Sequence, residues 1–124
     1  MKYIEVEFCC TCFVTESHTT ETYEKLFISQ LGPTLENLEI SFGLGRGRGG
    51  TKYFPEGLVK PLHKLLWLAL DNNGIEVVTE TALYNQGELQ YLNLESNRLQ
   101  DLPPNLIHQN VHKNLLDVRL SFNR

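Results

Sequence analysis

The chain has 124 residues, of which 41% are hydrophobic and 21% charged, and this size is sufficient for one domain with a buried core. Its net charge of −4 argues against an extended nucleic-acid interface, which needs clustered Lys and Arg side chains. No apolar run approaches the roughly 18 residues of a membrane-spanning helix, so we expect no membrane-spanning segment in this chain.

Five short phrases with Leu, Ile or Val at their fourth and sixth places predict five β-strands, beginning near residues 1, 35, 65, 89 and 115. The last three phrases start 24 and 26 residues apart and follow the pattern Leu-x-x-Leu/Val-x-Leu-x-x-Asn. This period fits one strand and one return segment, which is typical of a leucine-rich repeat. Because such a unit cannot bury a core alone, the pattern predicts an α/β solenoid in which each repeat packs on its neighbours.

The first phrase, Met1-x-x-Ile4-x-Val6-x-x-Cys9, carries Cys where the later repeats carry Asn, and Cys is a common substitute at this place. Cys9 is therefore expected to be a buried structural residue, and Cys10 and Cys12 can pair with each other, with a distant Cys or with nothing. A zinc site formed by these cysteines and His18 is disfavoured, since adjacent cysteines cannot easily surround one tetrahedral ion. We expect neither a metal nor a cofactor.

The second phrase, Leu35-x-x-Leu38-x-Ile40, has Gly43 at the Asn place and is followed by an insertion rich in Gly and Arg, residues 45–50. Gly45-x-Gly47-x-x-Gly50 has the spacing of a dinucleotide-binding fingerprint. That motif needs a helix directly after its glycines, whereas Pro55 and Pro61 interrupt the stretch that follows. A single Arg-Gly-Arg-Gly-Gly copy on an acidic protein is also a weak RNA-binding signal. We expect a basic loop at the edge of the repeat.

The return segments contain several prolines, so short helices, 3₁₀ turns and extended pieces are expected, with helices at 56–64 and 80–84. Their apolar positions match between repeats: Ile75, Val78 and Leu83 correspond to Leu99, Leu102 and Ile107.

The Asn place of the last three repeats predicts structural residues. Its side chain is expected to lie inside the bend after each strand and to bond backbone groups of adjoining coils. The residues concerned are Asn73, Asn97 and Asn123.

The strands are expected to form a curved parallel sheet on the concave face, with short helices, turns and loops on the convex face. Trp67 and Tyr91 should be neighbours on the concave face, and exposed aromatic residues often anchor protein interfaces. The expected polar surround comprises Asp71, Asn93, Glu95, Asp117 and Arg119. Alternatively, the two rings only cover adjacent strands.

Nothing in the sequence resembles a catalytic site. The four histidines fall in loops or return segments, no Ser or Cys has a recognisable nucleophile context, and no carboxylate pair is placed to face across a cleft. The sequence therefore predicts a binding protein without catalytic residues.

Residues 1–124 are expected to form a single repeat segment belonging to a longer array. A solenoid needs terminal caps, yet the sequence stops at Asn123-Arg124 directly after a predicted strand, which should leave Val118 and Leu120 partly uncovered.

From about Phe27 to Arg124 the chain resembles the chaoptin-like family of leucine-rich-repeat adhesion proteins of insect photoreceptors. The resemblance rests on Thr34 to Gly43, on the Gly-rich insertion before Phe54-Pro55, and on Asn110 to Asn123. It implies homophilic cell adhesion at the extracellular face of the plasma membrane during photoreceptor morphogenesis, with no catalytic residues.

Two alternatives remain. An intracellular scaffold or regulatory protein would fit the absence of Asn-x-Ser/Thr glycosylation sites and unpaired thiols. A receptor ectodomain of the innate-immune type is the third class.

Overall fold

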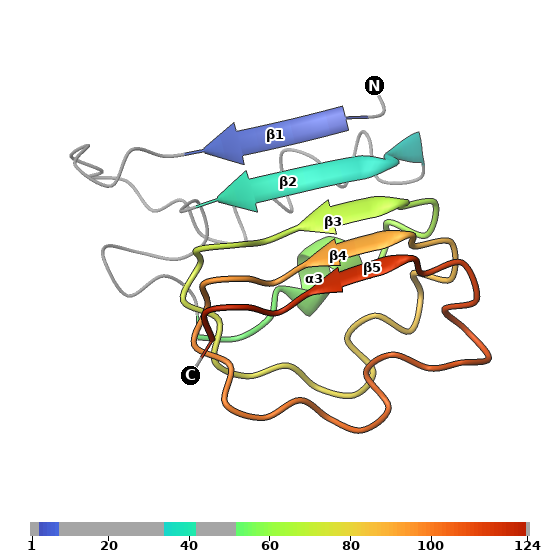
Figure 1. Cartoon of the computed structure of the whole chain (residues 1–124). Helices are drawn as coiled ribbons and strands as arrows, with labels where there is room; N and C mark the ends of the chain where they lie inside the picture. The colour runs from blue at the N-terminus through green and yellow to red at the C-terminus, as the bar shows by residue number, and fades with distance from the viewer. Residues whose placement is uncertain (1–2, 8–33, 42–51, 124) are drawn as a thin grey trace.

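The computed structural model of the chain describes residues 3–7, 34–41 and 52–123. Five strands form one parallel sheet in sequence order (Figure 1). They are β1 (Tyr3–Glu7), β2 (Asn37–Ser41), β3 (Trp67–Ala69), β4 (Tyr91–Asn93) and β5 (Asp117–Arg119). Among the described residues there is one short helix, α3 (Glu56–Val59), between β2 and β3 in sequence. The predicted strands and their parallel arrangement are confirmed, and the curvature of the sheet stays a prediction.

The pairing register follows the leucine phrases. The fourth place of every phrase falls in one row across the sheet: Ile4 pairs with Leu38, Leu38 with Leu68, Leu68 with Leu92, and Leu92 with Val118. The first strand, whose assignment rested on a Cys-for-Asn substitution, therefore joins the array in the predicted register.

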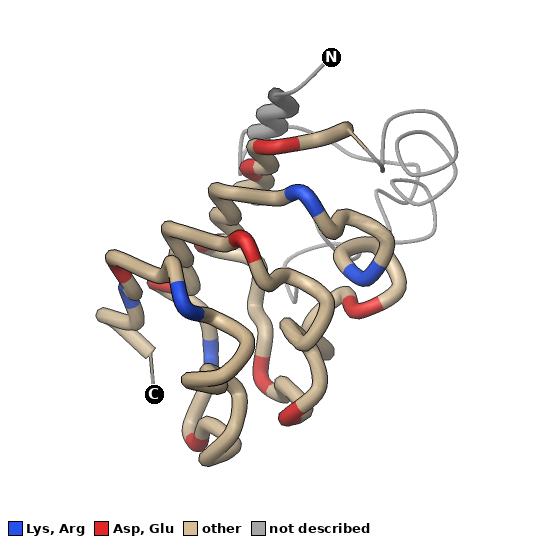
Figure 2. The backbone as a smooth tube through the Cα atoms, turned by 90° about the vertical axis from the view of Figure 1, so that its right-hand side faces the viewer, with Lys and Arg blue, Asp and Glu red and all other residues tan. Residues whose placement is uncertain are grey.

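The apolar core fills the space between the sheet and the return segments, whose successive coils lie side by side in Figure 2. The inward places of the two central repeats are completely buried: Leu65, Leu68, Leu70, Leu89, Leu92 and Leu94. Ala69 is also buried, although its place was predicted to face outward. Its neighbours in register are Glu39 and Asn93, whose longer side chains leave a methyl group little access to solvent.

A left-handed residue follows each of the last three strands at the same place. Asn72, Ser96 and Phe122 have φ angles of 59°, 55° and 63°. A residue with a Cβ atom adopts this conformation at some cost, so the repeat geometry overrides local preference here, most of all at Phe122.

The return segments contain less helix than the sequence predicted. The helix expected over 56–64 stops at Val59. Lys60 still has helical geometry and donates to Glu56 O, but Pro61 lacks the N–H group that would continue the series. The helix expected over 80–84 is wrong. This stretch forms tight turns, in which Ala82 N donates to Thr79 O and Tyr84 N to Thr81 O, both at 3.1 Å.

The match between Leu83 and Ile107 is also wrong, because Leu106 is buried and Ile107 is 37% exposed. The spacing from Leu89 to Leu115 is two residues longer than that from Leu65 to Leu89, so offsets do not carry through the whole return segment. As in the preceding repeat, where a turn forms at Thr79, the segment turns at Pro103 and Pro104. There Leu106 N donates to Pro103 O at 3.1 Å and the Leu106 side chain turns inward.

Several predicted features lie outside the described residues. They are Cys9, Cys10, Cys12, His18, Gly43 and the Gly- and Arg-rich stretch 45–50. In the part of the chain that is described, no helix has the length and apolarity needed to cross a membrane.

Candidate functional site

The surface of the sheet that points away from the core carries the candidate site. We call it the outer face. It comprises positions 37, 39 and 41 on β2 and the matching positions 67, 69 and 71, then 91, 93 and 95, then 117, 119 and 121. Side chains on a strand alternate between its two faces, so these positions point to the side opposite the buried leucines.

Trp67 and Tyr91 stack at the centre of the outer face. Their ring centroids are 3.7 Å apart and their planes differ by 17°. The parallel register creates this contact, because Trp67 on β3 lies directly opposite Tyr91 on β4. Trp67 remains 38% exposed, so part of a large, rigid aromatic surface faces solvent.

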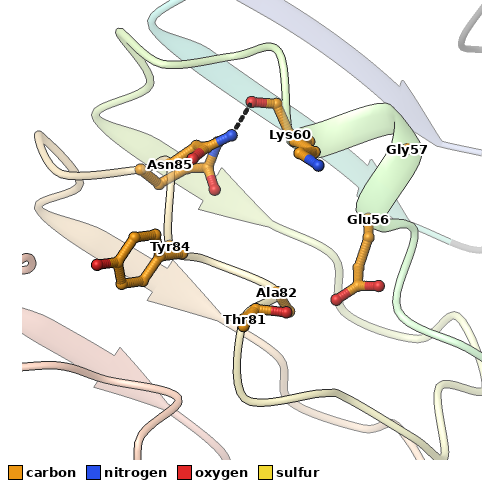
Figure 3. Close-up of a pocket in the computed structure, with 8 residues that line it drawn as sticks. Glu56, Gly57, Lys60, Thr81, Ala82, Tyr84 and Asn85 are labelled. Carbon is orange, nitrogen blue, oxygen red and sulfur yellow. Dashed lines mark hydrogen bonds between the residues drawn. The ribbon is translucent and has the colours of Figure 1, made fainter.

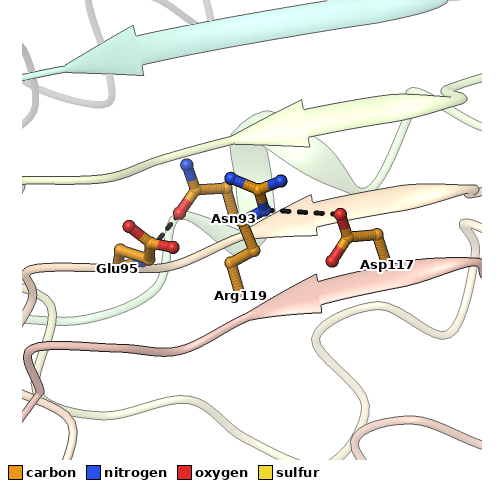
Figure 4. A network of polar contacts seen from close by, with 4 residues as sticks. All are labelled: Asn93, Glu95, Asp117 and Arg119. Carbon is orange, nitrogen blue, oxygen red and sulfur yellow. Dashed lines mark hydrogen bonds and ion pairs between the residues drawn. The ribbon is translucent and has the colours of Figure 1, made fainter.

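Arg119 lies on the β5 side of the aromatic pair. Its guanidinium carbon is 5.6 Å from the Tyr91 ring centroid, and its Nε donates to Asp117 Oδ2 at 3.3 Å (Figure 4). Tyr91 is the largest contributor to a raised pKa of Arg119, followed by the hydrogen bond and charge of Asp117. The side chains of Arg119 and Asp117 are about half exposed, so this ion pair contributes little to stability.

Hydrogen bonds also involve other polar residues that were predicted to surround the aromatic pair. Asn93 Oδ1 accepts from the Glu95 backbone N–H at 2.9 Å (Figure 4). Asp71 Oδ2 accepts from Ser41 Oγ at 2.9 Å and from Asn72 Nδ2 at 3.0 Å. All seven residues predicted for this surface thus lie on β3, β4 and β5 or two residues beyond a strand.

The side chains of the repeat asparagines lie inside the protein and not on the outer face. Asn97 Oδ1 accepts from the N–H groups of Asn73 at 2.9 Å and Ile75 at 3.0 Å, both in the preceding repeat. Its Nδ2 donates to Leu70 O and Leu94 O, each at 3.0 Å. With a further contact from Nδ2 to Glu95 O at 3.2 Å, one side chain bonds five backbone groups at the boundary between two repeats.

The other two asparagines extend this ladder. Asn73 Nδ2 donates to Ile40 O at 2.7 Å. Asn123 Oδ1 accepts from Leu99 N at 3.0 Å, and its Nδ2 donates to Leu94 O at 2.8 Å. The described geometry gives these residues a role in joining repeats.

A second polar ladder was not predicted. Gln86 is completely buried, and its Nε2 donates to Val59 O in the preceding return segment at 2.8 Å. His112 is also buried. Its Nδ1 accepts from His108 N at 2.9 Å, so Nε2 carries the proton and donates to Leu83 O at 2.7 Å.

The signal for this second ladder was available in the sequence. Leu62, Gln86 and His112 each precede the opening leucine of a repeat by three residues, and all three are buried. Aligning the repeats backwards from that leucine would have shown the shared place. An apolar pattern search misses it because two of its three members are polar.

A pocket of about 460 Å³ lies on the return side, between α3 and the turns that follow Thr79 (Figure 3). Two of its polar side chains are bonded within the protein: the Thr79 hydroxyl donates to Glu56 Oε1, and Asn85 Nδ2 donates to Lys60 O at 3.2 Å. Gln86 Oε1, by contrast, is buried with no partner among the described residues. The pocket is a seam between two return segments. Within the described ranges, no group of three or more His, Cys, Asp or Glu residues could hold a metal ion.

Comparison with known families gives a match over the C-terminal half of the chain. The family described as leucine rich repeat matches residues 63–124, half of the chain, a span that includes β3, β4 and β5. A search of curated proteins finds no match, and nothing identifies chaoptin specifically. Leucine-rich repeats are typically non-enzymatic modules for protein interaction. The chain belongs to the leucine-rich repeat family.

Proposed function

We propose that the outer face binds a protein partner, with Trp67 and Tyr91 as the anchor. The stacked, partly exposed aromatic pair is the observation that carries this proposal. Interface hot spots are enriched in Trp and Tyr surrounded by polar residues that exclude water. Asp71, Asn93 and Glu95 supply such a surround, and their local hydrogen bonds fix parts of it in advance.

The proposal makes the chain a binding module without catalytic activity. The family is typically non-enzymatic, which supports this view.

Site-specific photo-crosslinking tests the proposal. A benzophenone amino acid at Asn93 samples the outer face, and the same group at Glu80, which is exposed in a return segment, is the matched control. We expect a defined protein to crosslink from position 93, and Trp67→Ala to abolish that crosslink. Equal capture from position 80, or capture that Trp67→Ala leaves unchanged, would contradict the proposal.

A thermal melt of Trp67→Ala separates binding from packing. If the ring serves the interface, thermal stability stays nearly unchanged while partner binding falls. A large loss of stability with intact binding would instead assign the two rings to covering adjacent strands.

A second proposal, carried by the family resemblance and not by the outer face, is homophilic adhesion at the extracellular face of the plasma membrane, contributing to photoreceptor morphogenesis. It is supported by the resemblance of Thr34 to Gly43 and of Asn110 to Asn123 to chaoptin-like repeats. Non-adhesive cells that display the chain on a membrane anchor should then aggregate with one another and not with cells displaying the anchor alone. Equal behaviour of the two cell populations would rule out homophilic adhesion by this chain.

Thiol chemistry distinguishes the extracellular proposal from the intracellular scaffold. Cys10 or Cys12 in a disulfide in the native protein supports the extracellular site, because disulfides persist in oxidising compartments. Three reactive thiols support the scaffold.

A further inference from the structure

The charges on the outer face are strongly unequal. Its described positions on β2 to β5 carry four carboxylates and one cation: Glu39, Asp71, Glu95 and Asp117 against Arg119. Red acidic segments recur along the coils in Figure 2. Arg119 is paired with Asp117, so the surface beside the two rings keeps a negative field that attracts cationic groups.

The aromatic pair already accepts a guanidinium on one side. Arg119 lies over Tyr91 at 5.6 Å, within the distance at which a cation is attracted to the face of an aromatic ring. Tyr91 therefore has Trp67 on its β3 side and Arg119 on its β5 side. The arrangement is a cation–π ladder built from three adjacent strands.

The β2 side of Trp67 is different. No stacked ring or cation is found against Trp67 on that side within residues 34–41 and 52–123. The strand register puts Asn37 beside Trp67 and the carboxylate of Glu39 two residues further along β2. Indole is the aromatic group that attracts cations most strongly, so the exposed part of Trp67, on the same face as the Asp71 and Glu95 carboxylates, suits a cationic group.

We propose that the outer face binds a basic segment of its protein partner, with an Arg or Lys side chain on the exposed part of Trp67 and further cations beside Asp71 and Glu95. The inference rests on the proposed protein-binding function and specifies the chemistry of the partner. A second copy of the chain fits poorly here, because two outer faces would bring like charges together. Homophilic adhesion would consequently need a different surface.

The fluorescence of the single Trp in the chain reports directly on this site. The probe is a capped decapeptide of alternating Arg and Gly, and its Glu and Gly counterpart is the charge control. We expect the Arg peptide to change the emission of Trp67 saturably and the Glu peptide to leave it unchanged. Peptide binding measured by calorimetry without any change in Trp67 emission would place the contact elsewhere and overturn the proposal.

Two double variants separate the site from the overall charge of the protein. Asp71→Asn with Glu95→Gln removes two charges beside the rings, and Glu80→Gln with Asp101→Asn removes two exposed charges from the return segments. The first pair should weaken binding of the Arg peptide about fivefold. The second should weaken it less than about twofold, because salt screens distant exposed charges.

Trp67→Ala, followed by calorimetry, should also weaken Arg peptide binding about fivefold through loss of the cation–π contact. Equal weakening by the two double variants would show general attraction to an acidic protein and overturn the proposal.

The crosslinking result separates failure of this inference from failure of the proposed function. If position 93 captures a protein in a Trp67-dependent manner but the Arg peptide does not bind, or the Glu peptide binds equally well, the basic partner is wrong and protein binding stands. If Trp67-dependent capture fails as well, both are wrong.

Discussion

The repeat that begins at Leu89 and the repeat that begins at Leu115 share one pattern but differ in burial. Leu92 and Leu94 are fully buried, whereas Val118 is 39% exposed and Leu120 is only partly buried. In the described sheet β4 pairs on both sides, with β3 and β5, and β5 pairs with β4 alone. The leucine pattern therefore determines the path of the backbone and which side chains point inward. The neighbouring repeats determine how much apolar area each of these side chains buries.

Truncation of the fourth-place side chain should give the largest difference between the two repeats. Leu92→Ala should lower the free energy of unfolding by about 4 kcal/mol, because it removes buried methyl groups and leaves a cavity. Val118→Ala should lower it by about 1 kcal/mol or less, since its site is open to solvent. Urea denaturation of the two variants measures this difference, and equal losses would show that β5 is covered in solution.

Substitutions in the asparagine ladder should show the same contrast between the two repeats, with smaller losses in the free energy of unfolding. Asn97→Ala removes this partner from the N–H groups of Asn73 and Ile75 and from Leu70 O, and should cost about 3 kcal/mol. Asn123→Ala should cost about 1 kcal/mol, because its site is partly open and water can replace the lost contacts. The comparison fails if the two free energies of unfolding fall together by the same amount.

The second ladder links the return segment before β5 to the one before β4. His112→Ala should cost about 2 kcal/mol, because His108 N loses this partner and Leu83 O keeps only its bond from Gln86 N. His112→Gln should recover part of this, since Gln occupies the same place at residue 86 and donates to the preceding return segment. Thermal unfolding of both variants is the measurement, and a glutamine variant no more stable than the alanine variant would disprove their equivalence.

Substitutions at the left-handed residues should change the free energy of unfolding least, and the change should be a gain in stability. Phe122 is 80% exposed and has φ 63°, so Phe122→Asn should raise the free energy of unfolding by about 0.5–1 kcal/mol at little packing cost. Ser96→Asn at the matching interior place should change it by less than about 0.5 kcal/mol. Differential scanning calorimetry distinguishes these shifts, and a destabilised Phe122→Asn would mean that the Phe122 side chain makes a contact in solution.

The strands could be predicted because their pattern is redundant. Leu68, Leu92 and Val118 repeat in one register, and a shift of one residue would turn every leucine toward solvent. The same register predicted the contact between Trp67 and Tyr91, which needs only strand alignment.

The return segments were less predictable because they contain no comparable periodicity. Leu106 is buried like Ala82 at the same offset, but Ile107 is exposed whereas Leu83 is buried, and the two successive segments differ in length after this point. The burial of Gln86 and His112 depends on carbonyl groups of the preceding segment, which a local pattern does not reveal. The charges of the outer face were readable in sequence, but the position of Arg119 over Tyr91 needed coordinates.

The asparagine ladder has a consequence for how the array opens. Asn97 accepts the N–H groups of Asn73 and Ile75, and Asn123 accepts that of Leu99, so each turn is completed by the repeat that follows it. Fraying of the last repeat would expose the Leu99 amide to hydrogen exchange while the Ile75 amide stayed protected. Cooperativity along the chain thus passes from repeat to repeat through single amide side chains, as well as through the shared core.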